Sequence, residues 1–206
     1  MTAIKSIVLE APEADTDAAN ALYASAWGLD KQVVVRPGDA PTAGFRGYTL
    51  SLIASQPADV DALVNAAVDA GATVIKPVSK SLWGYGGSVR TPDGAVWTIA
   101  SSSKKNTAPA SKKIDDIVLL LGVEDVAATK QFYVDRGLSV GRSFGRKYVE
   151  FTAPAGQIKL ALNGRKALAK NAGVSPEGSG SHRIVVNGDT EAFTDLDGFT
   201  WDVAPA

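Results

Sequence analysis

The 206-residue chain contains no cysteine, one methionine and a single histidine, His182. Without cysteine it can form no disulfide, no thiolate metal site and no cysteine nucleophile. The single histidine excludes every catalytic or metal site that needs two imidazole groups. Any reactive or binding site must therefore be built from carboxylates, hydroxyls, amines, guanidinium groups and at most one imidazole.

An excess of charge of one sign is also missing, since the formal net charge is −1 at pH 7. A nucleic acid or an anionic membrane would need a basic surface, so neither partner is expected. The longest apolar run covers only residues 117–121, and a bilayer span needs about 20 apolar residues. Residues 1–5 lead straight into a strand pattern rather than a secretion signal. We therefore expect a cytoplasmic, globular protein.

The chain does contain an internal repeat. Residues 91–98 (TPDGAVWT) return as residues 195–202 (DLDGFTWD), and residues 4–9 (IKSIVL) return as 114–119 (IDDIVL). Between the two copies lies a small, polar and basic stretch without apolar periodicity, which is typical of a flexible linker. The sequence therefore predicts one domain over residues 1–101, a linker over 102–113 and a second domain over 114–206.

The clearest secondary-structure signal is a helix with apolar residues at helical spacing from Val60 to Val68. Pro57 favours its start and Gly71 its end. The Asp93-Gly94 pair is typical of a hairpin turn, so we expect Asp93 to be structural rather than catalytic. Strands are predicted at 4–10, 33–35, 47–54, 73–77, 87–90, 95–100, 114–121, 147–152, 157–162 and 182–186, with a basic helix at 165–172.

The repeated openings, the Tyr-then-Gly-Leu helix ends and the closing hairpins resemble the vicinal oxygen chelate superfamily. This superfamily includes glyoxalase I, bleomycin-resistance proteins and extradiol dioxygenases. Three phrases are similar to one glyoxalase-like group within it: residues 44–50 (GFRGYTL), 83–87 (WGYGG) and 172–180 (AGVSPEGSG). The resemblance implies an α+β fold of tandem glyoxalase-like domains, built from paired βαβββ modules whose curved mixed sheets form cups.

Each half departs from that pattern in a complementary way. The first half lacks the third and fourth strands of its first module, because the chain passes directly from Pro37 to Phe45. The second half lacks the helix and the next strand of its last module, between Asn187 and Phe193. We therefore expect the two shortened halves to complete one another as an intramolecular pseudo-dimer.

The resemblance implies metal ligands, typically His and Glu, on the first, fourth, fifth and eighth strands of paired modules. The first half offers only poor ligands there: Ser6, Tyr48 or Thr49, and Thr98. The second half offers Asp116, Lys159, His182 and Asp202.

Two opposing arguments concern a metal in the second half. One imidazole and two carboxylates, from Asp116, His182 and Asp202, suit a divalent cation. Against this, the Lys159 ammonium group carries no free lone pair and repels a cation. A register slip of one residue would also turn His182 away from the cup, where it would be an ordinary strand-end histidine.

Candidates for binding an organic ligand are aromatic or cationic: Arg46, Tyr48, Trp83 and Tyr85. Trp97 and Trp201 lie on the repeated hairpins and are expected in the core. Glu150 alternates with apolar neighbours, so it either points into a cup, where it could act as a general base, or faces solvent.

The predicted function is binding of a small organic molecule in a cup without a metal cofactor. This would serve sequestration or resistance, or an accessory role. The alternative is a divalent-metal-dependent lyase, isomerase or dioxygenase using Asp116, His182 and Asp202. A third class is an interaction protein that retains only the fold. The sequence leaves open the ligand, the reaction and whether the chain forms a homodimer.

Overall fold

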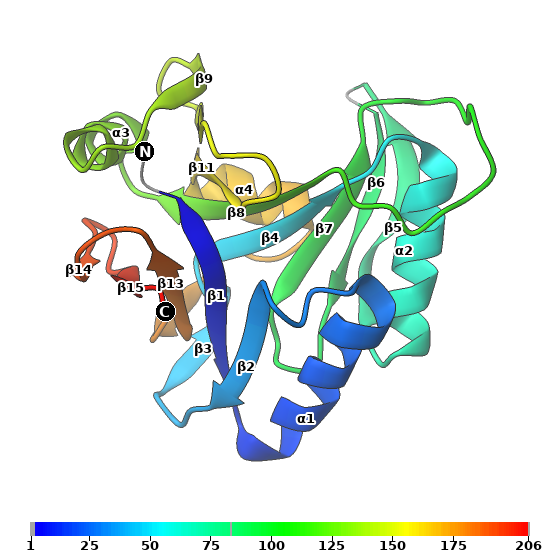
Figure 1. The fold of residues 1–206 in the computed structure, drawn as a ribbon, viewed down its shortest axis with the longest axis horizontal. Coiled ribbons are helices and arrows are strands. Elements are labelled where there is room, and N and C mark those ends of the chain that lie inside the picture. The colour runs from blue at the N-terminus through cyan, green and yellow to red at the C-terminus, as the bar shows by residue number, and fades with distance from the viewer. Residues whose placement is uncertain (1–2, 83, 206) are drawn as a thin grey trace.

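The computed structural model describes residues 3–82 and 84–205 (Figure 1). Over this part of the chain, two mixed β-sheets carry the fold, one of eight strands and one of five. The eight-stranded sheet has the order β5-β6-β7-β4-β8-β11-β10-β9, and the five-stranded sheet has the order β14-β15-β13-β1-β2. A short ribbon pairs β12 with β3. The fold is α+β, as predicted.

The first half contributes β1 Ile4–Ala11, α1 Glu13–Leu22, a π-helical turn Tyr23–Trp27, β2 Val33–Pro37, β3 Thr42–Gly44, β4 Tyr48–Ile53, α2 Pro57–Asp69, β5 Thr73–Ser81, β6 Gly84–Arg90 and β7 Val96–Ser101. The second half contributes β8 Asp116–Val123, α3 Val126–Asp135, β9 Val140–Phe144, β10 Tyr148–Phe151, β11 Lys159–Gly164, α4 Arg165–Ala172, β12 Gly178–Gly180, β13 Ile184–Gly188, β14 Phe193–Thr194 and β15 Thr200–Val203. The helix that the apolar spacing predicts is α2, which buries Val60, Leu63, Val64 and Ala67.

The two halves share both sheets, which confirms the expected pseudo-dimer. In the large sheet β4 runs antiparallel to β8, with Ser51 opposite Val118. In the small sheet β1 runs antiparallel to β13, with Val8 opposite Val185. Figure 1 shows the blue β1 lying beside the orange-brown β13, although the two strands lie at opposite ends of the sequence. The large sheet therefore combines one complete module from each half, and the small sheet combines the two shortened ones.

A buried aromatic cluster closes the first half. The Trp97 indole Nε1 donates to the Tyr23 hydroxyl at 3.1 Å, and that hydroxyl donates to Asp93 Oδ1 at 2.8 Å. Burial and the nearby Asp93 carboxylate raise the Tyr23 pKa, so the hydroxyl stays protonated and remains a donor. Asp93 is thus a structural turn residue, as the sequence predicts.

The second half repeats this arrangement. Trp201 Nε1 donates to the Tyr133 hydroxyl at 3.0 Å, and Tyr133 donates to Asp195 Oδ2 at 2.7 Å. Trp97 and Trp201 are both fully buried, as expected for core residues. The duplication read from the hairpin sequences is therefore also a duplication of buried hydrogen bonds.

Residues 102–113 lack helix and strand, yet they are held in place. Gln56 Oε1 accepts hydrogen bonds from the backbone N–H groups of Thr107 and Ala108, at 2.7 and 3.0 Å. Asp59 Oδ1 accepts from Ser111 N and Ser111 Oγ, at 2.6 and 3.0 Å. The segment is therefore tethered to the first turn of α2 rather than freely flexible. No helix in the described residues is both long and apolar enough to cross a membrane.

Candidate functional site

Strand alternation decides which side chains share a face of the large sheet. Ser51 on β4 lies opposite Thr98 on β7 and Val118 on β8, and Thr98 Oγ1 donates to Ser51 Oγ at 2.9 Å. The residues between them, such as Leu50 and Trp97, point to the other face and are fully buried. The polar row through Ser51 thus lies on the face opposite Leu50 and Trp97.

Helix α4 lies across this face. At its N-terminal end it passes so close to β8 that a Cβ on Gly122 would lie 3.1 Å from the Arg165 Cα. At its C-terminal end the Ala172 carbonyl accepts a hydrogen bond from the buried Ser88 hydroxyl at 2.6 Å. Leu168 packs into a small apolar cluster beneath the helix. Two cavities in the described part of the chain share no lining residue with each other.

The first cavity, here called the cup cavity, has a volume of about 300 Å³. It is lined by Ser51, Ile53, Asp116, Val118, Leu120, Arg142, Tyr148, Glu150 and Lys159. Lys159 Nζ lies 2.8 Å from Asp116 Oδ2, and the two side chains are 29% and 38% exposed. Tyr148 donates to Glu150 Oε2 at 2.9 Å. Burial, reinforced by Glu150, raises the Tyr148 pKa and keeps its hydroxyl protonated.

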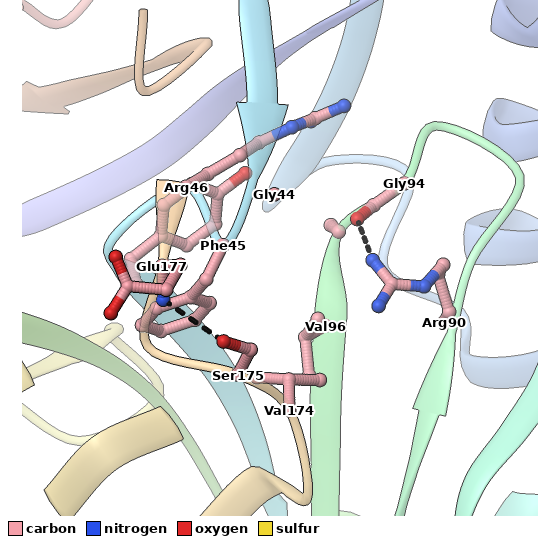
Figure 2. A pocket seen from close by; sticks show the side chains of 11 residues that line it. Gly44, Phe45, Arg46, Arg90, Gly94, Val96, Val174, Ser175 and Glu177 are labelled. Carbon is pink, nitrogen blue, oxygen red and sulfur yellow. Dashed lines mark hydrogen bonds between the residues drawn. The ribbon is translucent and has the colours of Figure 1, made fainter. Parts of the chain in front are cut away.

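The second cavity, here called the hairpin cavity, has a volume of about 350 Å³ and lies beside the 91–95 turn. It is lined by Gly44, Phe45, Arg46, Tyr48, Arg90, Gly94, Ala95, Val96, Val174, Ser175 and Glu177. Figure 2 shows Phe45 and Glu177 on one side of the cavity, with Val96 and Arg90 on the other.

The β3–β12 ribbon forms one wall of the hairpin cavity and explains two of the glycine-containing phrases. Gly44 pairs with Gly178, so the phrases at 44–50 and 172–180 lie against one another. A Cβ on Gly178 would collide with the Phe45 carbonyl oxygen, and a Cβ on Gly44 would collide with the Glu177 carbonyl oxygen. Only glycine allows the two backbones to approach this closely.

The structure does not assemble the predicted metal ligands. Asp116 lies in the large sheet, whereas Asp202 lies on β15 in the small sheet, exposed and accepting from the Val203 N–H. The His182 ring stacks on Phe199 at a centroid distance of 4.0 Å, outside both cavities. Among the residues that the structure describes, no three potential ligands converge on one point. The proposed triad was wrong because each cup draws its strands from both halves, not from one.

The register of His182 is now settled. Its Nε2 lies 3.0 Å from the Asp197 carbonyl oxygen, just as Arg46 Nη2 lies 2.6 Å from the Asp93 carbonyl oxygen. His182 is therefore the counterpart of Arg46, in the segment that precedes its strand. It is not the counterpart of Tyr48, the alternative that would have placed it in the strand.

The four residues predicted to bind an organic ligand do not all line one cavity. Arg46 and Tyr48 both line the hairpin cavity. Tyr85 lines neither cavity, because alternation along β6 turns it toward α2, where its hydroxyl donates to Asp61 Oδ1 at 2.8 Å. Trp83 lies outside the described residues.

Sequence reasoning missed Arg142 and Tyr148 in the cup cavity. The available signal was the spacing of Tyr148 from Glu150, which places both side chains on one face of β10.

Comparison with known proteins agrees with this architecture. The family model described as "Glyoxalase/Bleomycin resistance protein/Dioxygenase superfamily" matches residues 7–99. Glyoxalase I from Zea mays is similar in structure, with a TM-score of 0.61 over 98% of this chain and 91% of that chain. The first half of the chain is therefore similar in sequence to this superfamily. A putative dioxygenase from Bacillus subtilis subsp. subtilis str. 168 has a TM-score of 0.59, covering 98% of this chain and 84% of its own.

Sequence identity to each of these two superfamily structures is 12%, so the likeness shows the fold alone. No curated protein sequence matches the chain.

The metal site that the superfamily resemblance implies does not fit the cup cavity. Ser51, Thr98, Asp116 and Lys159 occupy the first and last strands of its two modules. Only Asp116 is an ordinary ligand for a divalent cation, and open metal sites usually use about three. The Asp116 carboxylate is already paired with the Lys159 ammonium group. We therefore derive no chemistry through a metal at this position.

Proposed function

We propose that this protein binds a small, partly aromatic organic molecule in the cup cavity without a metal cofactor. The observation that supports this most strongly is the Lys159–Asp116 pair at 2.8 Å on the floor of the cavity. The Lys159 ammonium group supplies positive charge that attracts a ligand oxygen, and a bound metal ion would supply the same kind of charge. Arg142 adds a second cation to the lining.

The chemistry of the walls indicates the kind of ligand. Ile53, Val118 and Leu120 offer apolar surface for a ring or alkyl group. Lys159 uses one of its three N–H donors on Asp116, so a ligand carbonyl, hydroxyl or carboxylate can accept from the others. The lining thus combines an apolar surface with polar groups that can orient a ligand, and small-molecule sites need both.

The arrangement of the carboxylates supports binding over proton abstraction. Asp116 accepts from Lys159, and Glu150 accepts from Tyr148. Both carboxylates are therefore already engaged by a donor of the protein itself. We therefore propose a sequestering, resistance or accessory role for the protein.

Binding can be tested with ¹⁵N-labelled protein and three probes that carry neighbouring oxygens: phenylglyoxylate, mandelate and catechol. Saturable shifts of the amides around Val118, Glu150 and Lys159 are expected for at least one probe. Lys159→Met removes a charge-assisted hydrogen bond, so affinity should fall about tenfold or more. Lys147→Met, on an exposed turn, is the matched control and should bind like the parent protein. The proposal fails if no probe saturates, or if Lys159→Met binds normally.

The metal-free part of the proposal has its own test. Protein purified without chelator should contain far less than stoichiometric manganese, iron, nickel or zinc by mass spectrometry. Stoichiometric metal that disappears in Asp116→Ala would show that the carboxylate ligates a cation despite Lys159. That result would overturn the metal-free reading and leave the cavity as a metal site.

A further inference from the structure

The lining of the cup cavity has two chemically different sides. Strands β4 and β8 supply the side here called the apolar side, made of Ile53, Val118 and Leu120. Strands β9 and β10 supply the side here called the charged side, made of Arg142, Tyr148 and Glu150. Two strands, β11 and β10, lie between β8 and β9, so the backbones of β8 and β9 are at most about 14 Å apart. A ligand that touches both sides is therefore elongated, with one apolar end and one polar end.

The charged side holds a cation whose donors are unused. Within the described part of the chain, no hydrogen bond or ion pair to the Arg142 guanidinium group is present. Lys159, by contrast, is paired with Asp116 at 2.8 Å. Glu150 lies opposite Arg142 in the strand pairing, but its Oε2 accepts from the Tyr148 hydroxyl. The Arg142 N–H groups are therefore available to an acceptor on a ligand.

An exposed aromatic ring lies next to this cation, at the rim of the cavity. Phe144 is 61% exposed, lies opposite Tyr148 in the strand pairing, and has its ring centroid 6.1 Å from that of Tyr148. Side chains two residues apart on a strand share a face, so Phe144 lies on the face that carries Arg142. An ion pair that forms beside these rings is less accessible to water, which strengthens it.

The strand that carries Arg142 and Phe144 contributes little to the core. β9 is the outermost strand of the large sheet, it pairs only with β10, and every one of its residues is exposed (Figure 1). The charge of Arg142 acts on the cavity all the same, because it opposes the rise in the Tyr148 pKa that burial and Glu150 cause. Substitutions at Arg142 therefore test ligand binding without disturbing the fold.

We propose that the cup cavity takes an elongated carboxylic acid, whose apolar end lies on the apolar side and whose carboxylate lies on Arg142. This inference rests on the proposed function, since it names the ligand class and its orientation at that same site. Arg142 is then the residue that distinguishes an acid from a neutral compound of the same shape. A guanidinium group can bind a carboxylate through two parallel N–H···O bonds, and such charge-assisted bonds are the stronger ones.

The cavity dimensions set the length of the acid. A volume of about 300 Å³ accommodates a ring and a short chain. In benzoate the ring and the carboxylate are adjacent, so this acid cannot touch both sides at once. In 5-phenylpentanoate a chain of four methylene groups separates them. The affinity of each acid relative to its neutral amide should therefore increase from benzoate to 5-phenylpentanoate.

The test compares 5-phenylpentanoate with 5-phenylpentanamide by calorimetry and by amide shifts at residues 118–120 and 142–150. The acid should bind the parent protein about tenfold or more tightly than the amide, because only the acid forms a charge-assisted pair. Arg142→Met should remove this difference and keep the parent Tm. Arg146→Met is the matched control and should keep the difference, because Arg146 lies on the same turn but lines a separate hollow with Asp125.

Two variants of the other charged groups test the orientation. Lys159→Met should leave the ratio of acid to amide affinity unchanged, because the carboxylate lies on Arg142. Glu150→Gln removes a negative charge opposite Arg142, so the affinity of the acid should rise about threefold while that of the amide stays the same. A ratio lost in Lys159→Met and kept in Arg142→Met would place the carboxylate on Lys159 and overturn the proposed orientation.

Three other results would also overturn the inference: equal affinity of acid and amide for the parent protein, a parental ratio in Arg142→Met, or no binding of either compound at millimolar concentration. If phenylglyoxylate, mandelate or catechol still saturates in those cases, the proposed function stands and only the ligand class is wrong. If none of these three probes saturates either, the proposed function fails as well.

Discussion

Replacing Tyr23 with phenylalanine tests whether the repeated aromatic clusters hold the fold together. The Tyr23 hydroxyl accepts from Trp97 Nε1 and donates to Asp93 Oδ1, and all three groups are buried. Tyr23→Phe leaves one donor and one acceptor without partners. Each buried orphan costs roughly 1–3 kcal/mol, so we expect the free energy of unfolding to fall by about 2–6 kcal/mol.

The assay is urea unfolding at neutral pH, followed by tryptophan fluorescence and far-ultraviolet circular dichroism. Tyr133→Phe removes the equivalent hydroxyl, which accepts from Trp201 and donates to Asp195, so it should cost a similar amount. Tyr48→Phe serves as the contrast, because its buried hydroxyl has no partner to lose. Equal destabilisation by Tyr23→Phe and Tyr48→Phe would refute the assignment of stability to these hydrogen bonds.

Three further changes test the rest of the structure. Lys159→Met should alter the free energy of unfolding by less than about 1 kcal/mol in urea titrations, because its ion pair is partly exposed. Burial raises the Asp59 pKa, but hydrogen bonds from Ser111 and Gln56 outweigh it and leave the pKa below its usual value. The stability that Asp59 contributes is therefore present above the unfolded pKa of about 3.9 and is lost as pH falls through the lower folded value. As pH falls through that range, the urea midpoint of unfolding should decrease less steeply in Asp59→Asn than in the parent protein. An equal dependence of the midpoint on pH would contradict this. Gln56→Ala should release residues 102–113 and speed tryptic cleavage there, whereas an unchanged cleavage rate would show that the tether is unimportant.

Local features of the fold followed from the sequence because their causes are local. The apolar spacing from Val60 to Val68 and the nearby Pro57 were enough to predict α2. The Asp93-Gly94 turn was also predicted, and Gly94 has the positive φ of 84° that such a turn requires. The repeated hairpin motif located Trp97 and Trp201 in the core because duplicated sequence placed them in equivalent surroundings.

The grouping of site residues could not be predicted in the same way. Whether Asp116 shares a cup with His182 or with Ser51 depends on which strands pair, and β4 pairs with β8 across the linker. Period-2 alternation fixes relative faces only, so it could not decide between the cup and α2 for Tyr85. The division of the cup cavity into an apolar and a charged side has no signature in sequence either, since it depends on which strands lie side by side.

The central claim is that the cup cavity holds an organic ligand where the ammonium group of Lys159 replaces a metal. Anomalous diffraction tests it most directly, with crystals soaked in manganese and a brominated derivative of whichever probe binds the cup. The account predicts a bromine peak among Ile53, Val118 and Leu120, and no manganese peak beside Asp116. A manganese peak on the Asp116 carboxylate, or bromine found only away from this cavity, would contradict it.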